Sequence, residues 1–196
     1  MPELQLLRPD HYPAVLAFER NNRAFFARSV PDRGDAYFEN INERLDALLV
    51  DQSAGTAGFY LLLGDDASVL GRFNLEFEPA ATARLGYRVA ERVCGRGVAT
   101  ATVVELCRLA ASRHGMRTLT AAVADRNPAS QRVLIKAGFA PLRPAHPADL
   151  SGETGTWYQR ELDSTSSRMH DSGTPNHSAK REYGRRLLAE LPSECQ

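Results

Sequence analysis

The stretch Gly86-Tyr-Arg-Val-Ala-Glu-Arg-Val-Cys-Gly-Arg-Gly-Val-Ala-Thr100 decides how the rest of the sequence is interpreted. An apolar strand ends near Val89, a turn with two glycines follows, and a long helical pattern begins at Val98. Gly95 and Gly97 let the backbone take positive φ or approach a ligand closely. The first amides of a helix lack partners within it, and the helix dipole favours an anion there by about 0.3–1 kcal/mol. The turn therefore predicts a cradle for a phosphate or pyrophosphate group.

Other interpretations of this turn compete with the cradle. The glycines could serve only the geometry of a strand-to-helix connection. A Walker loop requires a Gly-Lys pair, which the sequence lacks. A dinucleotide fingerprint requires a glycine where Thr100 stands and an early βαβ unit, whereas this turn lies mid-chain after a predicted hairpin. The spacing weakens both nucleotide-binding alternatives and leaves the purely geometric one open.

Hydrophobic periodicity predicts a mixed α/β or α+β domain. Helices are predicted after an Asp10 cap through Arg20, over Tyr37–Leu49, over Val98–His114 with Gly115 as a left-handed C-cap, and from Asn127-Pro128 to a stop at Gly138. Strands are predicted over 58–63, 68–77, 83–89, 118–123 and 156–162, and the first two form a hairpin around Gly64-Asp65-Asp66.

Composition and charge narrow the class of protein. The 196 residues contain 24 basic and 24 acidic side chains, so a broad basic surface for nucleic acid is not expected. The longest apolar runs, such as 59–63, fall far short of the roughly 20 residues that a membrane helix needs. Charged residues spread from Glu3 to Arg28 argue against a signal peptide. We expect a cytoplasmic protein that binds neither nucleic acid directly nor a membrane.

Cysteine and histidine usage predicts neither a disulfide framework nor a metal site. The three cysteines form no CxxC pair, and the five histidines show no ligand spacing. Composition changes near residue 163, where a Ser-, Thr- and Gly-rich stretch begins. We therefore expect one domain over residues 1–162, followed over 163–196 by a polar linker and a possible short C-terminal helix.

Two spaced motifs and a flanking strand carry a resemblance to a known family. The segment from Arg92 to Gly97 matches the pattern Gln/Arg-x-x-Gly-x-Gly/Ala, and Leu85–Val89 fits the strand before it. Further along, Asn127-Pro-Ala-Ser130 and the following run to Gly138-Phe139 match Asn-x-x-Ser…ΦΦ-x-x-x-Gly-Phe. In this order the motifs resemble those of the GNAT N-acetyltransferases, over roughly residues 3–162.

The resemblance implies a fold and a cosubstrate. The fold is a central twisted, mixed and mostly antiparallel sheet, flanked by helices, whose fourth and fifth strands splay apart to hold acetyl-CoA. The family pattern places the cosubstrate on a set of residues around the glycine turn and the second motif: Tyr87, Arg88, Val89, Arg92, Gly95, Arg96, Gly97, Val98, Ala99, Thr100, Asn127 and Ser130. No metal is implied.

Acetyl transfer to an amine suggests two candidate catalytic residues. Ser130 lies one helical turn after Asn127, and the resemblance assigns a serine there to protonation of the departing thiolate. Glu76 is the candidate base, because strand alternation puts Asn74, Glu76 and Glu78 on one face of the same strand. Each residue also has a plain alternative: Ser130 as a polar residue of a first helical turn, and Glu76 as a solvent-facing strand residue or one replaced by a water chain.

The acceptor is less well defined by the sequence. Asn22-Arg23-x-x-Phe26 and Pro31-x-Arg33 resemble the Rim-type branch, which acetylates the N-terminal alanine of ribosomal proteins. Together with Asn74 they form the predicted acceptor groove. The leading expectation is direct transfer to the α-amine of a protein or peptide, such as a ribosomal protein, by a monomer or homodimer. A small-molecule amine or antibiotic acceptor, and a CoA-binding module without catalysis, remain the alternatives.

Overall fold

The computed structural model describes residues 2–162 of the chain. The predicted polar linker and C-terminal helix of residues 163–196 lie outside the described residues. Within them, a seven-stranded sheet has the order β1-β2-β3-β4-β5-β7-β6. The strands are β1 (Glu3–Leu6), β2 (Ala57–Leu63), β3 (Val69–Glu78), β4 (Thr82–Val89), β5 (Thr118–Ala124), β6 (Ala140–Ala145) and β7 (Gly155–Glu161).

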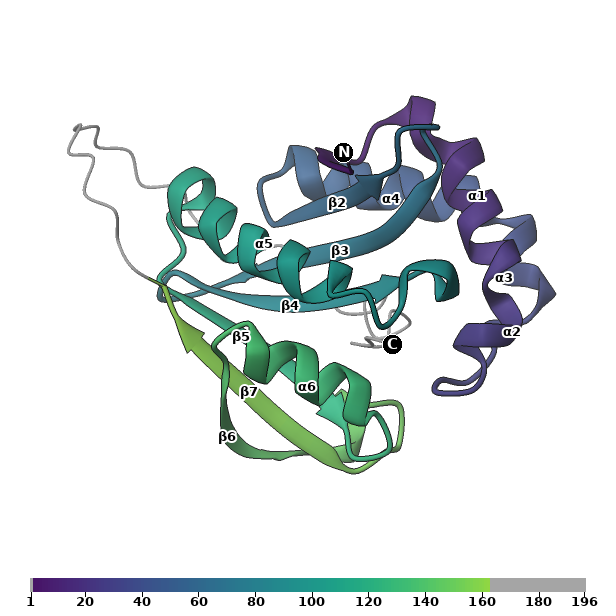
Figure 1. Ribbon diagram of the computed structural model, residues 1–196. Coiled ribbons are helices and arrows are strands. Elements are labelled where there is room, and N and C mark those ends of the chain that lie inside the picture. Colours follow the sequence, from purple (N-terminus) through teal and green to yellow (C-terminus); the bar gives the residue numbers. More distant parts are fainter. Residues whose placement is uncertain (1, 163–196) are drawn as a thin grey trace.

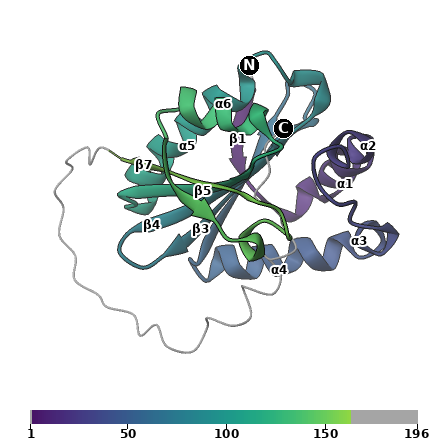
Figure 2. The ribbon, with the colours of Figure 1, turned by 90° about the horizontal axis from the view of Figure 1, so that it is seen from below.

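Helices cover both faces of this sheet (Figures 1 and 2). They are α1 (Tyr12–Asn21), α2 (Arg23–Phe26), α3 (Asp35–Glu39), α4 (Ile41–Ser53), α5 (Val98–His114) and α6 (Pro128–Lys136), with 3-10 turns at Pro9–His11, Glu91–Val93 and Pro147–Asp149. One core cluster joins the α5 side to Phe73, Leu75 and Leu85, and a second joins α1 and α4 to Phe59 and Leu61. Successive residues of a strand point to opposite faces of the sheet, so the central strands contribute side chains to both core clusters.

The sheet opens between β4 and β5. These two strands run parallel and pair only at Thr82–Thr118, Ala83–Leu119 and Arg84–Thr120, whereas all other neighbouring strands are antiparallel. Beyond Arg84, β4 and β5 diverge, as Figure 1 shows. Because α5 and α6 follow β4 and β5 in the chain, both helices begin at the open end of this gap. The expectation of splayed fourth and fifth strands is confirmed.

Most elements predicted from periodicity are confirmed. The α5 helix has the predicted bounds, and Gly115 after it adopts the left-handed conformation at φ +66°. The Asn127 side chain accepts a hydrogen bond from the Ser130 amide at 3.0 Å, as expected of an N-cap. Gly138 takes φ +83° after α6. Local capping chemistry is therefore sufficient to set these helix ends.

Four details of the prediction were wrong or incomplete. The predicted helix Tyr37–Leu49 is divided at Asn40 into α3 and α4. Asp10 does not cap α1, because its carboxylate accepts hydrogen bonds from Arg8 instead. The edge strands β1 and β6 were not predicted. The prolines in β6, Pro141 and Pro144, hide its strand pattern and are tolerated because β6 lies at the sheet edge.

Candidate active site

The glycine turn leaves its backbone open at the start of α5. Gly95 and Gly97 take φ values of +73° and +76°, and a side chain added at either position would meet no atom within 4 Å. Gly97 is the N-cap residue of α5, and no side chain caps this helix start. The first helical hydrogen bond comes from the Ala101 amide. The amides of Val98, Ala99 and Thr100 precede it, and their geometry fits an anionic ligand such as the pyrophosphate of CoA.

The charged residues of the turn contribute unequally to this opening. The Arg92 guanidinium donates a 2.5 Å hydrogen bond to the Ser68 hydroxyl, in the turn between β2 and β3. Arg96 is exposed. Arg92 is thus engaged away from the helix start, while Arg96 lies within the turn without such a contact.

The second predicted motif places Ser130 beside β4. Ser130 is 1% exposed and Asn127 is 5% exposed. The Tyr87 hydroxyl lies 3.4 Å from the Ser130 hydroxyl, and the Tyr87 ring stacks on Phe73 with centroids 5.7 Å apart. Because Tyr87 belongs to β4 and Ser130 to α6, this contact spans the gap between the splayed strands. The capped start of α6 fixes the Ser130 hydroxyl at the face of the gap that α6 covers.

The candidate base lies on the other face of the sheet. Glu76 faces Arg84 in the β3–β4 register and is ion-paired with its guanidinium. Burial raises the pKa of the Glu76 carboxyl, although the Arg84 charge opposes the shift. Arg84 is also the last β4 residue that pairs with β5. Glu76 therefore lies where the gap begins, and its raised pKa suits a group that accepts a proton.

The predicted acceptor-groove residues lie in three different places. Arg23, Phe26 and Arg33 line one small cavity, together with Arg88 of the splayed part of β4. Asn22 lies apart from it, because its amide group bonds the Phe18 carbonyl at 2.8 Å and the Glu91 amide at 2.9 Å. This places Asn22 as a brace between α1 and the loop after β4.

Asn74 is the remaining predicted acceptor-groove residue. It is half-buried and lies opposite Gly86 on β4, on the same sheet face as Glu76. Asn74 is therefore a neighbour of the candidate base Glu76 along β3. In the other direction along the same face, the next residue pair is Arg72 and Arg88, and Arg88 lines the small cavity.

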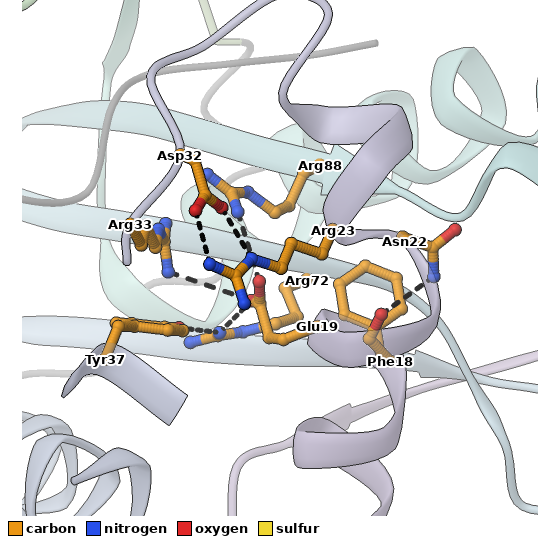
Figure 3. A network of polar contacts seen from close by, with 9 residues as sticks. All are labelled: Phe18, Glu19, Asn22, Arg23, Asp32, Arg33, Tyr37, Arg72 and Arg88. Atoms are coloured by element: carbon orange, nitrogen blue, oxygen red, sulfur yellow. Dashed lines mark hydrogen bonds and ion pairs between the residues drawn. The ribbon is translucent and has the colours of Figure 1, made fainter. Parts of the chain in front are cut away.

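A buried charge cluster lies beneath that cavity and was not predicted (Figure 3). The Glu19 carboxylate of α1 is ion-paired with Arg72 of β3, with Arg88 at 3.1 Å and with Arg33 at 3.9 Å. Burial alone raises the pKa of Glu19, but the three guanidinium groups together lower it to about 2. Burial and the charge of Arg88 lower the pKa of Arg33 to about 10, although Glu19 opposes this. The Tyr37 hydroxyl accepts a 3.3 Å hydrogen bond from Arg72.

The sequence contains signals for this charge cluster. Glu19 follows Val15 and Phe18 on the buried face of α1, where a solvated acid is not expected. Arg72 interrupts the mostly apolar sequence of β3 before Phe73, and Arg88 lies between Tyr87 and Val89 of β4. Charged residues at core positions of three separate elements indicate that they meet as partners, since an isolated buried charge is very costly.

A larger pocket lies beside the same elements. It has a volume of about 570 Å³ and is lined by residues of α1, of the β2–β3 turn and of the loop after β4, including Asn22, Ser68 and Arg92. Its lining contains neither Ser130 nor Glu76. The two candidate catalytic groups lie elsewhere: Ser130 contacts Tyr87 of β4, and Glu76 faces Arg84, where β4 still pairs with β5.

The acetyltransferase (GNAT) domain family matches residues 3–140, so the chain belongs to the GNAT acetyltransferases. It is an enzyme that transfers an acetyl group from acetyl-CoA to an amine. No curated protein sequence matches the chain.

Several solved structures share the fold. A ribosomal-protein-S5-alanine acetyltransferase from Vibrio fischeri matches with a TM-score of 0.75 and 19% identity, covering 83% of this chain and 93% of that one. RimL, a ribosomal L7/L12 α-N-protein acetyltransferase in complex with coenzyme A, matches with a TM-score of 0.73 and 21% identity over 83% and 95%. An acetyltransferase that modifies the N-terminal serine of ribosomal protein L7/L12 from Salmonella typhimurium matches with 0.72 and 22% over the same shares.

The described residues contain neither a membrane-spanning helix nor a metal-binding cluster. No helix in residues 2–162 is long and apolar enough to cross a membrane. No cluster of three or more His, Cys, Asp or Glu side chains in this part of the chain has the arrangement of a metal site.

Proposed function

We propose that this enzyme acetylates the N-terminal α-amine of a protein or peptide. The observation that carries the proposal is the charge of the acceptor side: Arg33, Arg72 and Arg88 outnumber the one carboxylate they surround. A site for polyamines or cationic antibiotics would instead be lined by carboxylates, which attract such amines. The similar folds of enzymes that modify the N-terminal residues of ribosomal proteins support the same acceptor class.

The chemistry of an α-amine suits a site with few ionisable catalytic groups. An α-amine has a pKa of about 7.7–8.0, so roughly one in ten molecules is neutral at pH 7, whereas a lysine amine near 10.4 is almost always charged. A modest base is therefore sufficient. Holding amine and thioester side by side can supply roughly 7–11 kcal/mol in the best intramolecular cases. Positioning is accordingly the main task of the fold.

Acetyl-CoA supplies the activated acetyl group when it is bound. The backbone amides from Gly95 to Thr100 would hold its pyrophosphate, and the unpaired edge of β4 beyond Arg84 would hold the extended arm. Tyr87, Val89 and Asn127 would contribute to the walls around that arm. This assignment uses the backbone of the glycine turn more than the arginines, because Arg92 is bonded to Ser68.

The two sides of the gap then divide the proton transfers. Glu76, on the acceptor face, accepts the proton that the amine loses, directly or through water. The Ser130 hydroxyl, close to Tyr87, donates a hydrogen bond to the charge that develops on the departing sulfur. A ribosomal-protein acceptor would place this reaction in the cytoplasm.

The proposed function is tested by thiol release from acetyl-CoA. Peptides beginning with Ala, Ser or Thr are compared with the same peptides carrying a blocked N-terminus and with small amines. Turnover of the free peptides that blocking abolishes is the expected result. Turnover of small amines alone would contradict the peptide assignment. CoA binding without turnover of any acceptor would indicate a binding module.

A further inference from the structure

The acceptor side of the gap carries an excess of buried positive charge. The side chains of Arg33, Arg72 and Arg88 are 12%, 8% and 8% exposed, and the Glu19 side chain between them is 2% exposed. Three cations and one anion leave a formal excess of two positive charges. Removing charge from water is costly unless a counter-charge is close. The excess therefore indicates an anion that completes the cluster.

Unused hydrogen-bond donors point in the same direction. Glu19 already accepts one hydrogen bond on each carboxylate oxygen, from Arg72 and from Arg88. The Arg33 Nη1 atom stays 3.9 Å from that carboxylate, beyond hydrogen-bond distance. Arg88 Nη2, Arg33 Nε and Arg33 Nη1 are buried and have no acceptor among the described residues. The guanidinium groups of Arg33 and Arg88, which both line the small cavity, thus keep unused hydrogen-bond donors.

The nearest other carboxylates do not meet this demand. Asp32 lines the same cavity, but Arg23 engages both of its oxygens, at 2.9 and 2.5 Å. Asp35 takes the remaining arm of Arg23 at 2.6 Å and is 82% exposed. These residues form a rim beside the cluster, as Figure 3 shows for Asp32 and Arg23. The donors of Arg33 and Arg88 stay unused inside that rim.

The cavity limits the size of the missing group. Its volume is about 10 Å³, which is roughly the space that one water-sized group requires. Its lining includes Arg23, Arg33 and Arg88, the two acidic residues Glu19 and Asp32, which the arginines already engage, and the apolar residues Phe26, Pro31 and Phe38. One oxygen of a carboxylate fits this space, and the fork of an arginine matches a carboxylate well.

The position of the cavity relates it to the acceptor. Arg88 follows Tyr87 on β4, so the two side chains leave opposite faces of the strand. A group held by Arg88 therefore lies on the opposite face of β4 from Ser130, the face that also carries Glu76 and Asn74. An extended peptide advances about 3.3–3.6 Å per residue, so the side chains at the second and third positions of an acceptor begin only roughly 3–7 Å along the chain from its reacting amine.

We propose that Arg33 and Arg88 bind the carboxylate of an acidic side chain at the second or third position of the acceptor. This inference rests on the proposed function and adds a substrate preference to it. Acetylation would then favour peptides in which Glu or Asp closely follows the reacting residue.

The test compares C-terminally amidated peptides that differ only by Glu or Gln at positions two and three. Amidation makes the side chain the only carboxylate near the amine. A hydrogen bond to a charged group corresponds to roughly a tenfold or larger effect. We expect the wild-type enzyme to show at least about a tenfold higher kcat/KM for the Glu peptide, mostly through KM. A dipeptide with a free C-terminal carboxylate, compared with its amide, shows whether a main-chain carboxylate can replace the side chain.

Variants locate the preference in the structure. Arg33→Gln is the first, because Arg33 contacts Glu19 only at 3.9 Å and its loss leaves the closer pairs intact. It should reduce the preference to within about twofold, while Arg33→Lys restores part of it. Arg28→Gln is the matched control: Arg28 is 66% exposed, pairs with Glu91 and lies outside the cavity. It should leave the preference unchanged.

The outcomes separate this inference from the proposed function. Equal turnover of the Glu and Gln peptides by the wild-type enzyme would overturn the inference and leave peptide acetylation standing. The same holds if Arg33→Gln and Arg28→Gln change the preference equally. Failure to acetylate any peptide would reject the proposed function, and the inference with it. Unchanged CoA affinity in each variant establishes that it is folded.

Discussion

The two faces of β4 differ in chemistry where the strand leaves β5. Towards α6, Tyr87 and Ser130 present uncharged hydroxyls against a stacked aromatic pair. Towards α1, Arg88 meets Glu19 and Arg33 in a buried cluster of charges. The difference shows that the sheet separates an uncharged environment from a charged one. The uncharged hydroxyls face the side assigned to the thioester of acetyl-CoA, which is itself uncharged. The fixed charges face the side assigned to the acceptor.

The helix starts at the gap differ in a related way. The start of α6 is closed by the Asn127 side chain, which accepts from the Ser130 amide. The start of α5 has a left-handed glycine and no side-chain cap. A closed start positions a side chain, and an open start receives an anion.

The largest effect is expected from Glu19→Gln, on the charged face. It leaves three buried guanidinium groups without their carboxylate, and breaking a buried ion pair in this way costs about 3–5 kcal/mol. Denaturant unfolding should show this loss, whereas Glu39→Gln, at an exposed position, should change stability by less than about 0.5 kcal/mol. A loss below about 1 kcal/mol would contradict the charge cluster as a structural unit.

The same carboxylate predicts a pH dependence of stability. Its folded pKa is about 2, below the ordinary value of 4.5. A depressed pKa contributes stability above the unfolded pKa, and this contribution is lost as pH falls towards the folded pKa. The free energy of unfolding should therefore decrease from roughly pH 5 to pH 2 in the wild-type protein, and less steeply in Glu19→Gln.

Gly97→Glu should weaken CoA binding by about a hundredfold or more. The change puts a negative charge where the pyrophosphate is expected, and it forces a side chain into φ +76°. Gly115→Glu is the matched control, because it carries a similar strain at φ +66° at the opposite end of α5. Calorimetry that finds unchanged affinity in folded Gly97→Glu would reject the cradle.

Ser130→Ala should slow the chemical step by about ten- to a hundredfold while CoA affinity changes little, since one hydrogen bond to developing charge is lost. Single-turnover kinetics separate the two quantities. Ser112→Ala, which removes an exposed hydroxyl bonded to the Arg108 carbonyl, is the control and should react at the wild-type rate. An unaffected single-turnover rate in Ser130→Ala would remove its proposed role.

Glu76→Gln should give the smallest effect, about tenfold in kcat/KM at pH 7. The base acts when deprotonated, so the wild-type rate should rise with pH through a Glu76 pKa that lies above its ordinary value, and again as the α-amine becomes neutral. The variant should lose the lower step only. Glu78→Gln, two residues along the same strand and exposed, should keep both steps, with the lower one moved to lower pH because the Glu78 charge helps to raise the Glu76 pKa. Two steps in Glu76→Gln would point to a water chain as the base.

Local signals predicted much of the fold. Periodicity and capping residues such as Asn127 and Gly115 were enough for α5, α6 and the central strands, because these elements end where their own side chains or glycines stop them. They failed where tertiary contacts decide. The β6 strand contains two prolines and exists because β7 pairs with it. The division between α3 and α4 falls at Asn40, a residue type that favours helix ends, but the apolar periodicity of residues 37–49 outweighed that local signal.

The candidate site shows the same division. The glycine turn, Asn127 and Ser130 could be found because a ligand-binding motif keeps its residues close in the sequence. The sequence contains Glu19, Arg72 and Arg88 as charges among apolar residues, but it does not predict which of them pair, because they come from three elements that meet only in the folded sheet. For Asn22, a role in the acceptor groove stays a prediction. It belongs to a motif-like segment but braces the loop after β4.

The most direct test of the account locates the acetyl group on a product. A peptide with a free N-terminal alanine, an acidic second residue and an internal lysine is incubated with the enzyme and acetyl-CoA, and fragmentation mass spectrometry assigns the modified amine. The account predicts acetylation of the α-amine and an unmodified lysine. Acetylation of the lysine, or of neither amine while a small amine is modified, would contradict it.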